Sequence, residues 1–200
     1  MTRLFKHSIV LVLTLFVAVA CERAAPTATE LTSGEPDELL GGLLGGSQVP
    51  GYTLVKEPLL PNLSELKISK LIGLEGGSLQ LLGHTVQVPL GAVTKPTLFT
   101  LVVLPTGYVE VDLGATTLSL LGLIDVGSQG FGGKLVPVTL SYSRATNVSS
   151  ANAPKLKVLR LNGLIGYRDF QVMPSQVNTT TRTVRTELDH FSRYAVAYPN

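Results

Sequence analysis

From Gly76 to the C-terminus, short apolar runs rich in Val, Leu, Thr and Tyr alternate with clusters of Gly, Pro, Asn and Ser. Over 108–113 apolar and charged positions alternate strictly, which predicts a half-buried strand with Glu110 and Asp112 on its wet face. No long segment carries a helical period, and many short strands separated by such turn signals predict an all-β fold, an antiparallel β-sandwich. The other predicted strands are 78–82, 85–88, 98–104, 117–126, 136–142, 155–161, 182–188 and 194–197.

The first twenty residues have a different pattern, typical of a secretory signal. Arg3, Lys6 and His7 form a short basic start, and an unbroken apolar run from Ser8 to Ala20 follows. The run is shorter than the roughly 20 apolar residues that span a bilayer. A charged start, a short apolar core and small residues at the end indicate a cleavable signal peptide over residues 1–20.

Cys21 is the only cysteine in the chain and directly follows this segment. The sequence Ala18-Val19-Ala20-Cys21 resembles the bacterial lipoprotein box, although Ala18 stands where that family usually has Leu. The resemblance implies that Cys21 is diacylglycerylated and N-acylated, for example with palmitate, after the signal is cut. It also implies a lipid-anchored, extracytoplasmic protein of the bacterial cell envelope. Glu22, rather than Asp, after the cysteine favours the outer membrane where one exists. The alternative is an ordinary secretory signal with a chance cysteine.

Composition divides the rest of the chain into a tether and a domain. Residues 21–50 are rich in Ala, Pro, Thr, Glu and Gly and include the repeat 39–46, Leu-Leu-Gly-Gly twice, which predicts a flexible tether. Residues 51–74 are transitional, because Pro58 and Pro61 interrupt them. Their apolar positions fit a short amphipathic helix or a first strand. The β-sandwich domain is predicted over 75–198.

Charge and residue types exclude several functions. The formal net charge is +2, there is no basic cluster and there is no Trp, so nucleic acid is not an expected partner. One cysteine excludes an intramolecular disulfide and a Cys-based zinc site, and the histidines are far apart, so no metal or other cofactor is predicted. His84 follows Gly83 in a predicted hairpin turn and is expected to be exposed. Residues 127–133 predict a mobile hairpin loop, since the Lys-Ser/Thr ending of a phosphate-binding loop is missing.

Four ordered patterns together resemble the ZU-five type of β-sandwich domain. They are 76–79 (Gly-Gly-Ser-Leu), 86–93 (Val-Gln-Val-Pro-Leu-Gly-Ala-Val), Phe131 with 137–142 (Pro-Val-Thr-Leu-Ser-Tyr), and 188–196 (Leu-Asp-His-Phe-Ser-Arg-Tyr-Ala-Val). ZU-five domains occur in ankyrins, netrin receptors and tight-junction proteins, and relatives occur in bacterial exported proteins. The resemblance implies a β-sandwich over about residues 75–198.

The triplet His190-Phe191-Ser192 is the candidate for chemistry. In some relatives such a triplet cleaves itself, which implies that Ser192 Oγ attacks the carbonyl carbon of Phe191 while His190 takes the hydroxyl proton. The resulting ester would then be hydrolysed by water. The strand register puts Leu188 and Phe191 on opposite faces, so a kink is needed for both to face inward. The alternative is a structural corner between sheets, with Phe191 in the core, Ser192 bonding a backbone group and His190 bonding locally.

These patterns predict a membrane-anchored binding or structural module whose partner is an envelope protein or a glycan. The alternative is a self-processing domain that cleaves between Phe191 and Ser192. A conventional hydrolase ranks below both, because the Gly-x-Ser-x-Gly motif is absent.

Overall fold

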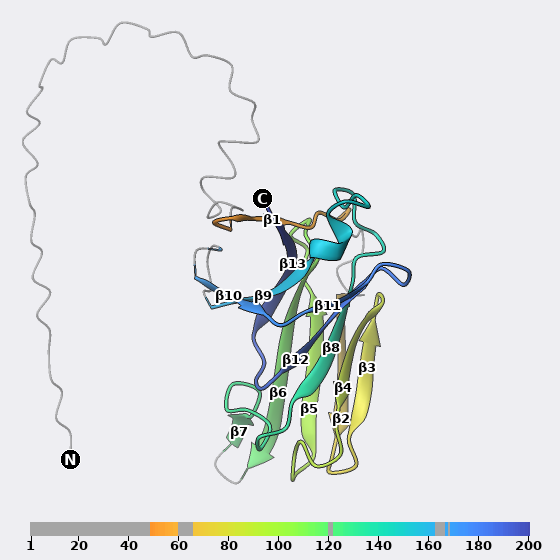
Figure 1. Cartoon of the computed structure of the whole chain (residues 1–200). Helices are drawn as coiled ribbons and strands as arrows, with labels where there is room; N and C mark the ends of the chain where they lie inside the picture. The colour runs from red at the N-terminus through yellow and green to blue at the C-terminus, as the bar shows by residue number, and fades with distance from the viewer. Residues whose placement is uncertain (1–48, 60–65, 120–121, 163–166, 168) are drawn as a thin grey trace, which may run out of the picture. The chain divides into compact units, whose positions relative to one another are not determined.

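The computed structural model describes residues 49–59, 66–119, 122–162, 167 and 169–200, which form two antiparallel β-sheets packed together (Figure 1). This arrangement confirms the predicted all-β antiparallel sandwich. The predicted signal peptide, Cys21 and the predicted tether up to residue 48 lie outside the described residues.

One sheet has eight strands, six of which follow the order β10-β9-β13-β6-β5-β2. In addition, β1 pairs with the end of β13, and β7 pairs with the end of β6. The strands of this sheet are β1 (Tyr52–Leu54), β2 (Lys67–Ile72), β5 (Thr97–Val103), β6 (Glu110–Ser119), β7 (Gly122–Asp125), β9 (Lys157–Leu161), β10 (Phe170–Met173) and β13 (Arg193–Pro199).

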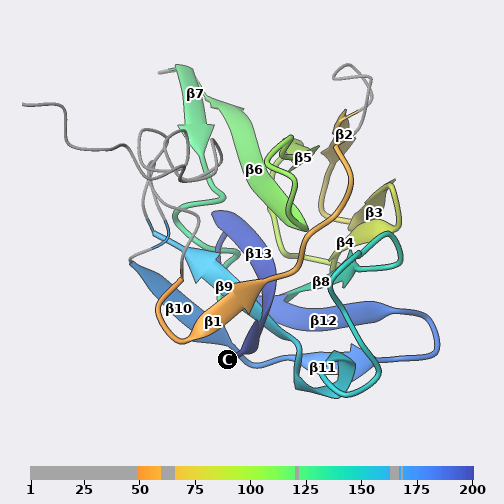
Figure 2. The same cartoon turned by 90° about the horizontal axis from the view of Figure 1, so that it is seen from above.

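The other sheet has five strands in the order β11-β12-β8-β4-β3. Figure 2, seen from above, shows β6 and β5 in one layer and β12 and β8 in the other. A 3-10 turn, Ala153–Lys155, precedes β9. The strands of this sheet are β3 (Gly77–Leu81), β4 (His84–Val88), β8 (Val136–Ser141), β11 (Gln176–Asn178) and β12 (Thr183–Leu188).

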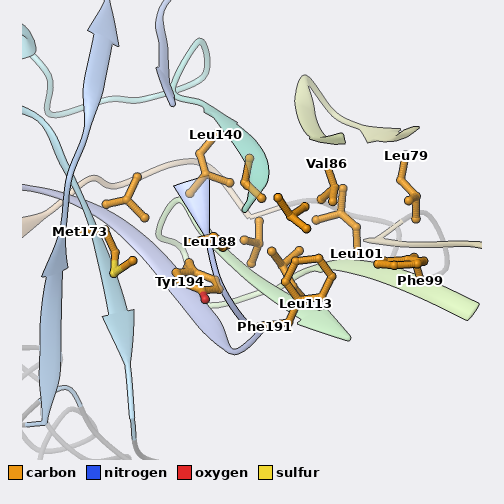
Figure 3. Packing of buried hydrophobic residues seen from close by; sticks show 14 of the residues in the cluster. Leu79, Val86, Phe99, Leu101, Leu113, Leu140, Met173, Leu188, Phe191 and Tyr194 are labelled. Atoms are coloured by element: carbon orange, nitrogen blue, oxygen red, sulfur yellow. The ribbon is translucent and has the colours of Figure 1, made fainter. Parts of the chain in front are cut away.

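Strand alternation turns one face of each sheet toward a shared main core. Along β5 every second residue from Thr97 to Val103 is buried, whereas Leu98 between them is 45% exposed. Side chains from both sheets meet in this core (Figure 3). Three phenylalanine rings pack together in this core, with Phe131 4.7 Å from Phe191 and 6.0 Å from Phe99 between ring centroids.

A second, smaller core covers the other face of the eight-stranded sheet around β13 and β9. Ala195, Ala197, Leu159 and Leu161 are buried on this face, although their strand neighbours point into the main core. The cover comes from segments distant in sequence, because Val49, Leu54 and Tyr167 belong to the same cluster. β13 and β9 are therefore buried on both faces.

The described fold includes most of the segment that the sequence left open. β1 pairs with β13 and β2 pairs with β5, so residues 52–54 and 67–72 are strands of the sandwich. Of the apolar positions Leu63, Leu66, Ile68, Leu71 and Ile72, which fitted either a short helix or a first strand, the last three lie in β2 and Leu66 directly precedes it. Leu63 lies outside the described residues. β10 and β11 were not predicted, because each is only three or four residues long and has no clear alternation.

Candidate functional site

The triplet His190-Phe191-Ser192 lies where the chain crosses from one sheet to the other. β12 ends at Leu188 in the five-stranded sheet, and β13 begins at Arg193 in the eight-stranded sheet. The bend lets Leu188 and Phe191, which a regular strand would point in opposite directions, both enter the main core (Figure 3). The predicted kink and the crossing between sheets are thus confirmed.

Backbone hydrogen bonds fix this corner on both sides. The Phe191 N–H donates to the Gly127 carbonyl at 2.7 Å, and the Ser192 carbonyl accepts from the Leu113 N–H at 3.1 Å. The approach at Gly127 is close, because a Cβ there would lie 3.0 Å from the backbone nitrogen of Ala115 and 3.3 Å from Cβ of Phe191. A side chain at this position would require the neighbouring segments to shift by a few tenths of an ångström.

The polar groups of the triplet contact neighbouring side chains and backbone groups. The His190 ring lies between two charged neighbours, with Nδ1 2.6 Å from the Asp189 carboxylate and Nε2 against the Arg160 guanidinium. Because a guanidinium only donates, Nε2 is the acceptor and the ring proton lies on Nδ1. The Ser192 hydroxyl donates to the Leu161 carbonyl at 3.2 Å.

The geometry of self-cleavage is therefore not assembled. Among the described residues no hydrogen bond joins His190 to the Ser192 hydroxyl, and the lone pair on Nε2 already accepts from Arg160. Left-handed backbone strain does not lie at the triplet either. Among the described residues, the non-glycine positions with this conformation are Leu82 and Arg182. The structure brings the predicted base and nucleophile to one corner but does not pair them.

The glycine-rich segment 127–133 meets the same corner. It connects β7 to β8, which belong to different sheets, so the prediction of a hairpin loop is wrong. Phe131 fixes the segment, since its ring is 1% exposed in the main core. This crossing and the corner together line a shallow cleft of about 360 Å³. Its polar lining residues are Ser128, Gln129, Lys134, Asp189 and His190.

Glu110, predicted on the wet face of its strand, is 0% exposed, whereas Asp112 is exposed as predicted. The prediction for Glu110 is wrong because Tyr167 and the second core cover this part of β6. The Glu110 carboxylate pairs with the Arg193 guanidinium and accepts hydrogen bonds from the hydroxyls of Tyr167 at 3.1 Å and Thr106 at 2.8 Å. Local alternation cannot reveal this cover, because the covering residue is 57 positions away.

The side chains around Glu110 form a cluster in which the charged groups also contact one another. The Arg193 guanidinium also lies over the Tyr167 ring, 5.3 Å from its centroid. Burial, together with the negative charge of Glu110, raises the pKa of Tyr167 to about 12, so its hydroxyl stays protonated and donates to the carboxylate. A buried carboxylate with a guanidinium and two hydroxyl donors is satisfied, and the cluster is a structural bridge between β6 and β13.

His84 is also buried, contrary to the expected exposed turn residue. The turn itself is present, since Leu82 and Gly83 have φ values of 53° and 86° between paired Leu81 and His84. The imidazole, however, is 0% exposed between β4 and β8. Its Nδ1 accepts the Ser141 N–H at 3.2 Å, and its Nε2 has no hydrogen-bond partner among the described residues.

No family model matches the chain, and no curated protein is significantly similar to it. The ZU-five resemblance stays a prediction. In the part of the chain that the structure describes, no group of three or more His, Cys, Asp or Glu side chains could hold a metal ion. No helix of the described residues has the length and apolar character needed to cross a membrane.

The buried imidazole predicts acid-sensitive folding. Burial, and secondly the charge of Arg144, lowers the pKa of His84 from 6.5 to about 4. Between these pH values the unfolded chain binds a proton that the folded chain does not, so the free energy of unfolding falls as the pH falls, by roughly 3 kcal/mol. In His84→Asn, the amide oxygen replaces the Nδ1 acceptor without titrating. We expect urea unfolding at pH 6.5 and pH 4 to show a larger acid loss in the wild type, and equal losses would contradict this assignment.

Removing the cation beside Glu110 should destabilise the fold strongly. Arg193→Met leaves a buried carboxylate uncompensated, which costs about 3–5 kcal/mol of unfolding free energy. The matched control is Arg185→Met, because Arg185 pairs with Glu187 at 3.6 Å and both side chains are about half exposed (48% and 52%). That change should cost at most about 1 kcal/mol. Urea unfolding measures both values, and similar losses in the two variants would show that Glu110 does not depend on Arg193.

Proposed function

We propose that the chain is a lipid-anchored, extracytoplasmic protein whose β-sandwich is a non-enzymatic binding or structural module. The observation that carries the non-enzymatic part is the corner at residues 189–192. Its histidine is occupied by Asp189 and Arg160, and its serine donates to Leu161. The residues that resembled a catalytic pair act as structural groups in the crossing between the sheets.

The anchor rests on the sequence. A short apolar run ends directly before Cys21, the only cysteine, and 27 residues separate it from Val49, where the described fold begins. A flexible chain of this length spans about 30 Å on average. Acylation of Cys21 would therefore hold the sandwich near a bilayer while leaving its surface accessible to an envelope partner.

The cleft between residues 128–135 and the corner is the surface that we assign to partner binding. Its lining offers hydroxyl, amide, ammonium and carboxylate groups, which suit the polar groups of a protein segment or a glycan. Both walls are held by backbone bonds or by a buried phenylalanine, so the site is preorganised.

Self-processing has no supporting contact in this arrangement. The fragment that cleavage would create is Ser192–Asn200, which contains all of β13. β13 pairs with β9, β6 and β1, and the side chains of residues 194–197 are at most 1% exposed. A cut between Phe191 and Ser192 would therefore release nothing unless the sandwich also unfolded.

A denaturing mass spectrum of the full-length gene product, purified from bacterial membranes, tests both parts of the proposal. We expect one species that begins at Cys21, carries a diacylglyceryl group and an N-linked acyl chain, and is intact through Asn200. Cys21→Ser should lose the acyl mass and the membrane association. Ser192→Ala should differ from the wild type only by the substitution.

Two results would contradict the proposal separately. An unmodified Cys21 would refute the anchor but leave the module untouched. A pair of fragments that join at Phe191 and Ser192, present in the wild type and absent from Ser192→Ala, would establish self-processing instead.

A further inference from the structure

A second cavity, of about 330 Å³, lies beside the start of β1 and shares no lining residue with the cleft of residues 128–135. Its lining includes two aromatic rings, those of Tyr52 and Tyr108, and three polar side chains, those of Thr53, Lys56 and Asn200. The two tyrosines and Thr53 are half-buried, whereas Lys56 and Asn200 are exposed. The cavity therefore brings aromatic and hydrogen-bonding groups together at a place that solvent reaches.

Both tyrosine rings are held by other aromatic rings of the second core. The ring of Tyr52 forms a T-shaped contact with Phe170, at 5.8 Å between centroids, and that of Tyr108 with Tyr167, at 6.4 Å. Tyr167 is itself fixed by its hydrogen bond to Glu110. A T-shaped contact uses at most one face of a ring, so these contacts orient the two tyrosines and leave at least one face of each unused.

The backbone around the cavity is also fixed. The Asn200 N–H donates to the Gly51 carbonyl at 3.2 Å, and Lys56 and Tyr108 face each other as an antiparallel bridge. The Thr53 hydroxyl donates to the side-chain carbonyl of Asn200 at 2.6 Å. A ligand would therefore meet groups that are already in position, which lowers the entropy cost of binding.

Several hydrogen-bonding groups of the cavity have no partner among the described residues. They are the hydroxyls of Tyr52 and Tyr108, the Lys56 ammonium and the side-chain amide nitrogen of Asn200. All four can donate hydrogen bonds, and the two hydroxyls can also accept them. The cavity thus offers donors and acceptors beside two oriented aromatic rings.

We propose that this site, the β1 cavity (Tyr52, Thr53, Lys56, Tyr108 and Asn200), binds a saccharide. A pyranose ring has apolar C–H faces and a rim of hydroxyl groups. Its C–H faces would lie on the two tyrosine rings, while its hydroxyl groups would bond the Lys56 ammonium and the Asn200 amide. Both properties of the ligand are matched by groups that the fold holds in place.

The size of the cavity favours a small ligand over a protein surface. Sites for small ligands have volumes of about 300–1,000 Å³, and the β1 cavity lies at the lower end of this range. A specific protein partner would cover about 800 Å² of surface on each side. One or two sugar units of a larger glycan fit the cavity without such an area.

Saccharide binding at this site requires neither acylation of Cys21 nor the corner at residues 189–192. It adds a ligand class and a second site to the proposed binding module. A failure of saccharide binding would therefore leave the lipid anchor and the intact chain unaffected, and each of these is measured separately.

The test begins with an array of immobilised neutral and acidic oligosaccharides. The array is probed with the full-length gene product in detergent, detected by an antibody, because a tag after Asn200 would lie at the cavity. We expect binding that the free sugar competes away. The affinity for the best-bound oligosaccharide is then measured by titration calorimetry.

Aromatic variants test the stacking contact. Tyr52→Leu/Tyr108→Leu should weaken binding about tenfold, because two aromatic faces are lost. The matched control is Tyr198→Leu, since Tyr198 is also half-buried but packs on the main core and bonds the Asn147 carbonyl. The control should keep the wild-type affinity.

Lysine variants test the polar contact without disturbing the core. Lys56→Met should weaken binding about tenfold, because a charged donor to the sugar is lost. Lys67→Met is the control, since Lys67 is exposed in β2 and does not line the cavity. Both lysine variants should melt at the wild-type temperature, so they decide the question even if the tyrosine variant is unstable.

Two results would overturn the proposal. The first is that the wild type binds no saccharide on the array. If an envelope protein then co-purifies with the wild type and not with Lys56→Met, the cavity belongs to a protein partner instead. The second is that Lys56→Met binds sugar as tightly as Lys67→Met, which would place the saccharide elsewhere on the chain.

Discussion

The rest of the structure depends on the burial of β13 on both edges and both faces. β9 pairs with one edge, and β6 and then β1 pair with the other. Tyr194 and Val196 point into the main core, whereas Ala195 and Ala197 contact the second core. The middle residues of such a strand have no solvent-exposed face and no unpaired edge. The neighbouring segments must therefore supply both its hydrogen-bond partners and its packing contacts.

The corner and the buried ion pair follow from this position. Since β12 lies in the opposite sheet, the chain must cross the sandwich within four residues before β13 begins at Arg193. Phe191 fills the core at the crossing, and Arg193 reaches Glu110 on the neighbouring strand. His190, which has catalytic potential in sequence, contacts the Asp189 carboxylate and the Arg160 guanidinium at this crossing. These contacts support the proposal of a module that binds through its surface.

The alternation of apolar and polar residues predicted those strands whose burial is decided within the strand itself. β3, β4, β8 and β12 have clear apolar alternation, and their predicted ranges agree with the structure within two residues. The kink at the triplet was also predictable, because Leu188 and Phe191 both needed burial across an odd spacing. Patterns within a single strand carried enough information in these cases.

The errors arose where distant segments supply the environment. The alternation within its own strand predicts that Glu110 is exposed, but Tyr167 and the second core cover it. His84 reads as a turn residue, but its ring is enclosed between β4 and β8. The glycines of segment 127–133 favour a turn and so predict a hairpin. The segment instead connects two strands that belong to different sheets. None of these environments is encoded within a short window of sequence.

Native-state hydrogen exchange along β13 tests the central claim most directly, namely that this strand is enclosed on all sides. If it is, the amides of residues 194–197 open only when the whole domain unfolds, and their exchange free energies equal the global free energy of unfolding. The amides of β7, which pairs only with β6 among the described strands, should exchange through smaller local openings. Exchange of residues 194–197 as fast as that of β7 would contradict the enclosed position of β13 and the structural role of the corner before it.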